Sequence, residues 1–155
     1  MVGLGTGAAR APNRKSELEE ACAKIRRNGL ETGVRSEAGA SFLAETYDSN
    51  TVDAASLLAF TSDFLPPDLA RSTRERIEAV LGAGALIFRN EKLREEGEGA
   101  FLLCSFWRIN HLIKEGEIES AAKLLDELLA QANPLGLFSE EIDERCQGAL
   151  VDERS

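Results

Sequence analysis

Residues 98–114 have apolar side chains in nearly every direction around a predicted helix. A helix that is apolar on almost every side must be buried over most of its surface. After a short turn at Gly116, a second helical pattern over 117–132 has apolar residues on one face and charged residues opposite. So short a connection predicts an antiparallel helical hairpin, with its first helix in the core.

Three more helices are predicted upstream of this hairpin. A capping box that begins at Ser16 predicts a helix that ends at Gly29. The mostly apolar stretch 52–64 predicts a second helix, which two consecutive prolines stop. The second of these prolines, Pro67, suits the first turn of a third helix with an apolar stripe.

The remaining segments are predicted to connect the helices. Residues 30–50 are rich in turn formers, 85–88 are short, apolar and β-prone, and the charged run 91–96 is typical of an exposed loop. We therefore expect an all-α chain of about five helices. The predicted division is a poorly ordered lead-in over 1–15, a helical domain over 16–145 and an irregular tail over 146–155.

Composition argues against several partners and locations. A net charge of -9 disfavours binding to nucleic acid or to an anionic membrane. No stretch approaches the roughly 20 apolar residues that span a bilayer, and the N-terminus lacks the pattern of a signal peptide. The cysteines Cys22, Cys104 and Cys146 are odd in number and far apart, which favours reduced thiols and a cytoplasmic location.

Few residues have the pattern of a metal or nucleophile site. His111 is the only histidine, which argues against a His-rich metal site. A Ser/His/Asp triad would need His111, and the sequence has no G-x-S-x-G elbow to supply the nucleophile. On so apolar a helix His111 is most simply a core residue. We expect neither a metal nor a cofactor.

Two acidic segments each allow two interpretations. Glu140, Glu141 and Asp143 follow the helical hairpin and form either a solvated acidic turn or a pocket mouth with a general base. Glu98 lies between two glycines just before the buried helix, where a structural role and a binding role both fit. The residues alone do not choose between these interpretations.

Two stretches of the sequence have a distinctive composition: Gly97 to Trp107 reads GEGAFLLCSFW, and Gly136 to Asp143 reads GLFSEEID. Together they resemble signature segments of glycoside hydrolase family 15, which includes glucoamylases, glucodextranases and bacterial trehalases. The segments Val52 to Leu58 and Phe64 to Pro67 also follow the family's order. The resemblance runs from about Ser16 to Asp143 and implies a partial (α/α)6 toroid built of antiparallel helical hairpins.

The resemblance also implies an activity and a set of site residues. It implies inverting hydrolysis of an α-linked glucoside or trehalose by two carboxylates. It assigns the general base to Glu140. It assigns positions that line the sugar site to Arg89, Glu98 and Asp53. The chain departs from the family at Asn90, where an aromatic residue is common.

The family's general acid lies in a Trp-Glu motif upstream of the matched segments. The resemblance therefore predicts a chain that carries the base without the acid and has very low activity alone, because general acid catalysis contributes about 10²- to 10⁴-fold. A half-toroid would expose the faces that its missing helices cover, which predicts self-association or pairing with a complementary half-domain. The alternative is a non-catalytic helical module that binds a sugar or another protein.

Overall fold

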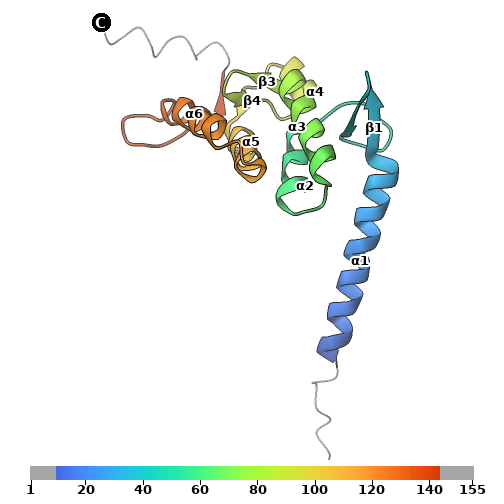
Figure 1. The fold of residues 1–155 in the computed structure, drawn as a ribbon. Helices are drawn as coiled ribbons and strands as arrows, with labels where there is room; N and C mark the ends of the chain where they lie inside the picture. The colour runs from blue at the N-terminus through green and yellow to red at the C-terminus, as the bar shows by residue number, and fades with distance from the viewer. Residues whose placement is uncertain (1–9, 144–155) are drawn as a thin grey trace, which may run out of the picture.

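The structure, a computed structural model, describes residues 10–143 (Figure 1); the predicted tail over 146–155 lies outside them. The prediction of a mainly helical fold is confirmed. The helices are α1 (Arg10–Gly33), η2 (Ala54–Ser56, a 3-10 helix), α2 (Leu57–Thr61), α3 (Pro67–Leu81), α4 (Glu91–Glu95), α5 (Leu102–Glu115) and α6 (Ile118–Leu129). Antiparallel two-stranded sheets join them: β1 (Val34–Glu37) with β2 (Ala40–Leu43), β3 (Gly82–Ala83) with β4 (Leu86–Ile87), and β5 (Ala100–Phe101) with β6 (Glu141–Ile142).

One face of helix α5 lies in the core, as its apolar sequence predicts, but Leu103 is 48% and Ile113 50% exposed, so the helix is not buried on nearly every side. Full burial of a large apolar side chain contributes about 1.5 to 3 kcal/mol relative to exposure, so this helix organises its neighbours. At Gly116, φ is 84°, a left-handed conformation that suits glycine and lets α6 turn back along α5. One cluster of buried apolar side chains joins α5 to α2, α3, β4 and α6: Leu57, Ile77, Leu86, Ile109, Leu112 and Leu128.

Helix α1 is longer than predicted at both ends. It begins at Arg10 rather than Ser16 and continues to Gly33 rather than ending at Gly29. Gly29 does not cap the helix. A Cβ atom at Gly29 would lie 2.7 Å from Cζ of Phe64, so glycine here allows close packing of the helix against that ring.

Residues 30–50, predicted as turns, contain the β1–β2 hairpin. Ala38 and Gly39 have φ values of 51° and 86°, as the two-residue turn of a tight hairpin requires. The N–H of Leu43 donates to Oγ1 of Thr73 at 3.0 Å, which fixes the hairpin to α3. The hairpin is stabilised by its contact with α3, which the local pattern of turn formers does not indicate.

Three other predicted boundaries also differ from the structure. The helix predicted over 52–64 is shorter in the structure: only the 3-10 helix η2 and the short helix α2 form within these residues. The run 91–96, predicted as a loop, forms α4, because Oδ1 of Asn90 accepts the N–H of Leu93 at 2.9 Å and caps the helix. Helix α5 begins at Leu102 rather than at residue 98, because the two preceding residues pair with β6.

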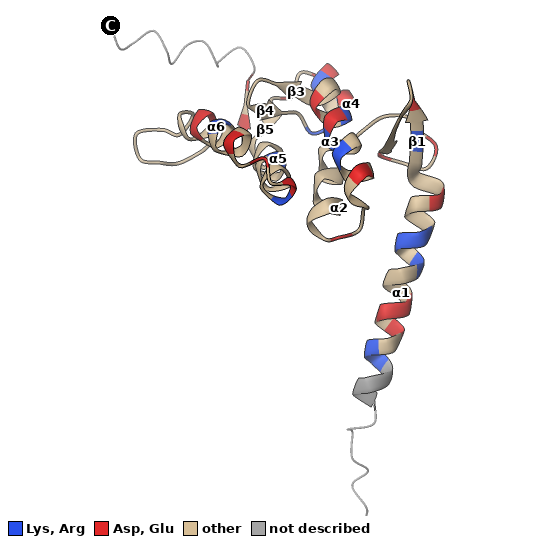
Figure 2. Ribbon diagram, in the orientation of Figure 1, with Lys and Arg blue, Asp and Glu red and all other residues tan. Residues whose placement is uncertain are grey.

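Helix α1 projects away from the rest of the structure (Figure 1). Side chains 14–28 are exposed, including Leu18 at 60% and Ile25 at 64%. Figure 2 shows acidic and basic residues in alternation along the helix. A helix of this length spans about 36 Å, so most of its surface has no partner among residues 14–143.

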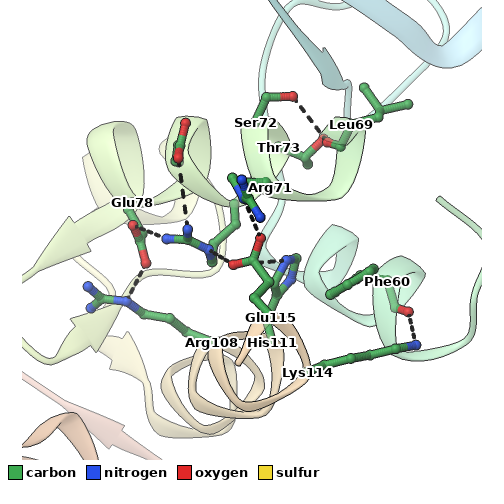
Figure 3. Close-up of polar contacts among 12 residues, drawn as sticks. Phe60, Leu69, Arg71, Ser72, Thr73, Glu78, Arg108, His111, Lys114 and Glu115 are labelled. Carbon is green, nitrogen blue, oxygen red and sulfur yellow. Dashed lines mark hydrogen bonds and ion pairs between the residues drawn. The ribbon is translucent and has the colours of Figure 1, made fainter. Parts of the chain in front are cut away.

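A network of charged side chains fixes the end of α5 to α3 (Figure 3). The side chain of Glu115 is only 3% exposed and accepts hydrogen bonds from Nε of Arg74 at 2.7 Å and from Nε of Arg71 at 3.2 Å. Glu78 pairs with Arg74 and Arg108, each at 2.7 Å. Every buried charge in this network has an opposite partner, which offsets the cost of its desolvation.

His111 is buried beside this network, as its helix predicts. Its ring centroid lies 4.5 Å from that of Phe60, and its Nε2 lies 3.9 Å from Oε2 of Glu115. Burial lowers the pKa of His111 to about 4, although the charge of Glu115 opposes the shift. The imidazole is therefore neutral at neutral pH.

We expect acid to destabilise the fold through His111. The unfolded chain protonates this residue near pH 6.5 and the folded chain near pH 4, so the unfolded state binds the proton first as pH falls. The free energy of unfolding should drop through this window, by about 3 kcal/mol in total. Urea unfolding of the wild-type chain and of His111→Gln across the window measures the effect. A difference between the two chains that does not change with pH would contradict it.

Candidate functional site

The N-terminal end of α5 is hydrogen-bonded to the backbone of Glu140, just before β6. The N–H of Leu102, the first residue of α5, donates to the carbonyl oxygen of Glu140 at 3.0 Å. The first N–H groups of a helix have no acceptor within the helix, so this bond satisfies one of them. The backbone at Glu140 is thereby fixed to the start of the buried helix.

Strands β5 and β6 bring the two acidic segments together. Ala100 pairs with Ile142, and Phe101 pairs with Glu141. A Cβ atom at Gly99 would lie 3.0 Å from the carbonyl oxygen of Ile142 and 3.3 Å from Cβ of Glu141. Glycine is needed at this position because the two backbones approach so closely.

Glu98 and Glu140 lie at opposite ends of this pairing, and both are exposed. The pairing register places Glu140 opposite Leu102, whereas Glu98 precedes the paired residues of β5. The N–H of Glu98 donates to the carbonyl oxygen of Leu93 at 3.0 Å, which ties the turn after α4 to its helix. The structure thus joins the two segments without placing the two carboxylates opposite each other.

Asp53 and Arg89 form an ion pair, with 3.5 Å between Oδ2 and Nε. Asp53 is held firmly, because its Oδ1 accepts the N–H of Ala55 at 2.7 Å and its side chain is only 14% exposed. The N–H of Ala54 also donates to the carbonyl oxygen of Arg89 at 2.9 Å. The Arg89 side chain is 49% exposed. The carboxylate is therefore fixed, while the guanidinium reaches solvent.

The first turn of α5, with Cys104 and Ser105, lies close to this ion pair. Burial raises the pKa of the Cys104 thiol to about 12, with a further increase from Asp53 and an opposing effect of Arg89. This thiol is protonated at neutral pH and unreactive. Oγ of Ser105 accepts the N–H of Ile87 at 2.9 Å, which fixes β4, just before Arg89, to α5.

Sequence reasoning missed this role of Ser105. The available signal was one hydroxyl inside an otherwise apolar stretch of helix. Ser105 is fully buried, and a buried hydroxyl needs a hydrogen-bond partner. Within residues 14–143, no group of His, Cys, Asp and Glu side chains is arranged to hold a metal ion. No helix of the described chain is long and apolar enough to cross a membrane.

Two hollows of the surface are not lined by the predicted site residues, although the first includes Ala55, whose N–H Asp53 accepts. One, of about 530 Å³, is lined by residues that include Leu43, Tyr47 and Phe64. The other, of about 610 Å³, lies between α3 and α6 and is lined by residues that include Arg74 and Lys123. Neither contains Asp53, Arg89, Glu98 or Glu140, so these hollows do not identify the candidate site.

The chain is similar in sequence to several trehalases. It is 35% identical over 130 residues to a trehalase of Mycobacterium tuberculosis, an alignment that covers 79% of this chain and 18% of that protein. It is 34% identical over 128 residues to a trehalase of Thermoplasma volcanium, covering 79% of this chain and 20% of the relative. The chain therefore spans about a fifth of the length of these relatives. No family model matches it.

The fold is similar to that of a solved glycosidase. The wild-type glycosidase superposes with a TM-score of 0.74 at 22% sequence identity, covering 94% of this chain and 40% of that one. Its E335A variant, solved in complex with glucose, gives a TM-score of 0.73 with the same identity and coverage. This likeness shows that the chain has part of an (α/α)6 toroid.

We expect Gly99→Ala to open the junction between β5 and β6, because its methyl group would be too close to Ile142. Hydrogen exchange at the N–H of Leu102, which reports the bond to Glu140, should become faster. Gly39→Ala is the matched control, since Gly39 has a left-handed φ of 86° in the distant β1–β2 hairpin. Unchanged protection of the Leu102 amide in Gly99→Ala would show that the junction does not depend on this glycine.

The sequence comparison identifies the family, and the structural comparison shows the fold. The trehalases share about a third of their aligned residues with this chain, and the glycosidase shares its helical architecture. The sequence resemblance identified from the two signature stretches is thus confirmed at the level of a trehalase-like protein. The chain belongs to the trehalase-like glycoside hydrolases, of which it spans a part.

Proposed function

We propose that this chain is the base-bearing part of an inverting family 15 glycoside hydrolase that acts on an α-linked glucoside. Glu140 is the general base that activates water. Arg89, Glu98 and Asp53 line the sugar site. The observation that carries the proposal is the junction at the start of α5, where the two signature stretches meet through β5 and β6.

The exposure of Glu140 fits a site that other helices complete. An inverting glycosidase holds its acid and its base about 6.5 to 9.5 Å apart, with room for one water molecule. Among the described residues, the backbone of Glu140 is fixed and its side chain is exposed. Helices from the rest of the toroid would form the other side of the site. The general acid belongs to hairpins of the toroid that lie outside residues 10–143. The described part alone therefore has very low activity.

Arg89 supplies hydrogen-bond donors for a sugar. Its guanidinium is half exposed, and the fixed carboxylate of Asp53 orients it. A guanidinium has five N–H donors, and sugar hydroxyls accept such bonds. The relatives named trehalase and the neighbour solved with glucose support a substrate built of glucose units.

A cytoplasmic location accompanies this proposal. Cys22 is exposed and Cys104 is buried, and both are free thiols in the structure. Free thiols persist in reducing compartments, whereas secreted proteins tend to form disulfides. Fractionation of the source cells, with an antibody against the chain, measures the location.

We expect the purified chain to release no glucose from trehalose or from maltooligosaccharides beyond the amount released by Glu140→Gln prepared identically. Without a general acid, the rate should be lower by about 10²- to 10⁴-fold than that of a complete enzyme. A glucose assay of both preparations measures this. Release by the wild-type chain that Glu140→Gln abolishes would contradict the absence of the acid, although it would support Glu140 as a catalytic group.

The role of Glu140 is tested most sharply in a complete enzyme. In the M. tuberculosis trehalase, the aligned segment can be replaced by this chain, so that the relative supplies the remaining hairpins. Glu140→Gln should then lower trehalose hydrolysis by about 10²- to 10⁴-fold. Glu141→Gln is the matched control, because it alters an adjacent exposed carboxylate. Equal activity of the two variants would exclude Glu140 as the base. If the folded chimera binds trehalose without hydrolysing it, the second candidate, a non-catalytic sugar-binding module, is favoured.

The exposed apolar side chains favour a helical partner. Leu18 and Ile25 of α1, and Ile118 and Leu129 of α6, are each at least half exposed. Isolated apolar side chains are normal at a surface, but α1 and α6 each expose such a pair, and α5 exposes Leu103 and Ile113 at about half. A complementary half-domain that completes the ring would bury both helices. Self-association is the alternative way to cover them.

We expect the purified chain to associate with itself when no complementary part is present. Leu18→Glu combined with Ile25→Lys should shift the chain towards a monomer, because the substitutions place charges on the uncovered face of α1. Sedimentation velocity over a range of concentrations measures the change. As a control, Glu19→Gln alters the same helix at an exposed polar position. A wild-type chain that is monomeric at all concentrations would contradict self-association.

A further inference from the structure

The segment that leads from α6 to β6 and includes Glu140 buries few of its side chains in the core. Each residue from Asn133 to Glu141 is exposed, with Leu135 at 82% and Leu137 at 62%. Burial of apolar area therefore contributes little to the conformation of this segment. An exposed loop keeps one conformation only where hydrogen bonds or a few specific contacts define it.

One residue, Asn133, makes most of the hydrogen bonds in the first half of the segment. Its Oδ1 accepts the N–H groups of Leu135 and Leu137, each at 3.0 Å. Its backbone N–H donates to the carbonyl oxygen of Leu137 at 2.9 Å, and its own carbonyl oxygen accepts the N–H of Gly136 at 2.8 Å. Gly136 has a φ of 76°, which allows the backbone to close this turn.

The second half of the segment is held against α5 at two points. The ring of Phe138 lies edge-on to that of Phe106, with 5.8 Å between centroids. The carbonyl oxygen of Glu140 then accepts the N–H of Leu102. Since only two residues separate Leu137 from Glu140, the turn at Asn133 sets the direction in which the chain reaches both contacts.

We propose that Asn133 is the positioning residue for Glu140. Its side-chain oxygen closes the turn that directs residues 138–140 onto α5, and this fixes where the carboxylate of Glu140 lies. Asn133 acts through the backbone and touches no reacting atom. The inference rests on the proposed function of Glu140 as the general base, but the geometry it describes can be measured without a substrate.

The chemistry of the side chain makes the inference testable. Aspartate keeps the oxygen that accepts the two N–H groups, whereas alanine removes it. Because the turn is exposed, water replaces the lost acceptor, and the global stability of the chain changes little. If Asn133→Ala disorders only residues 135–140 and Asn133→Asp keeps them ordered, Asn133 positions this segment and has no general effect on folding.

Hydrogen exchange and nuclear relaxation by NMR test the geometry. In Asn133→Ala, the N–H groups of Leu135 and Leu137 should exchange about fivefold faster or more, and the amide of Glu140 should become more mobile. Asn133→Asp should resemble the wild-type chain. Asn110→Ala, which alters an exposed asparagine of α5, is the matched control. Unchanged exchange and mobility in Asn133→Ala would overturn the inference.

Calorimetric titration with glucose tests the consequence for the site. Asn133→Ala should bind glucose at least about fivefold more weakly than the wild-type chain, and Asn133→Asp should restore the affinity. A loop that loses order with no change in affinity would overturn the positioning role. If the wild-type chain itself does not bind glucose, the proposed sugar site fails in this chain, and the exchange experiment still decides whether Asn133 orders Glu140.

Discussion

The hydrogen bond from the N–H of Leu102 to the carbonyl oxygen of Glu140 joins the core of the protein to its candidate site. Helix α5 is positioned by burial and, at its other end, by the ion pairs of Glu115. The hydrogen bond and the pairing of β5 with β6 fix residues 140–142 to this helix. Ser105 extends the same support to β4 and so to Arg89. Helix α5 thus positions residues from two distant parts of the sequence, Arg89 and Glu140.

The sequence predicted which helices pack together better than it predicted the residues at which the helices begin and end. The mostly apolar sequence of α5 and the apolar stripe of α6 predicted an antiparallel hairpin, which the structure contains, with one face of α5 in the core. The start of α5 was wrong because β6, forty residues later in the chain, pairs with residues 100 and 101. The end of α1 was wrong because Gly29 meets the ring of Phe64, a contact across 35 residues. Local patterns carry no information about such tertiary contacts.

The candidate site could be predicted only in part, and its predicted residues rest on family resemblance. The acidic segments by themselves allowed a solvated turn as readily as a catalytic one. The structure adds the Asp53–Arg89 pair and the junction of the two signature stretches. Asn133 was not singled out, because an asparagine before proline is common in turns of every kind. The exposed faces of α1 and α6 fit a ring of which this chain supplies a part.

If sugar binds around the start of α5, NMR mapping of the chain with trehalose will locate the binding site. Amide resonances of the isotope-labelled chain would be followed as trehalose is added. We predict shifts concentrated at Arg89, at residues 98–102 and at residues 139–143, with saturation at one common affinity. Shifts confined to the hollow between α3 and α6, or no shifts at high trehalose concentration, would contradict the claim that this junction is a sugar site.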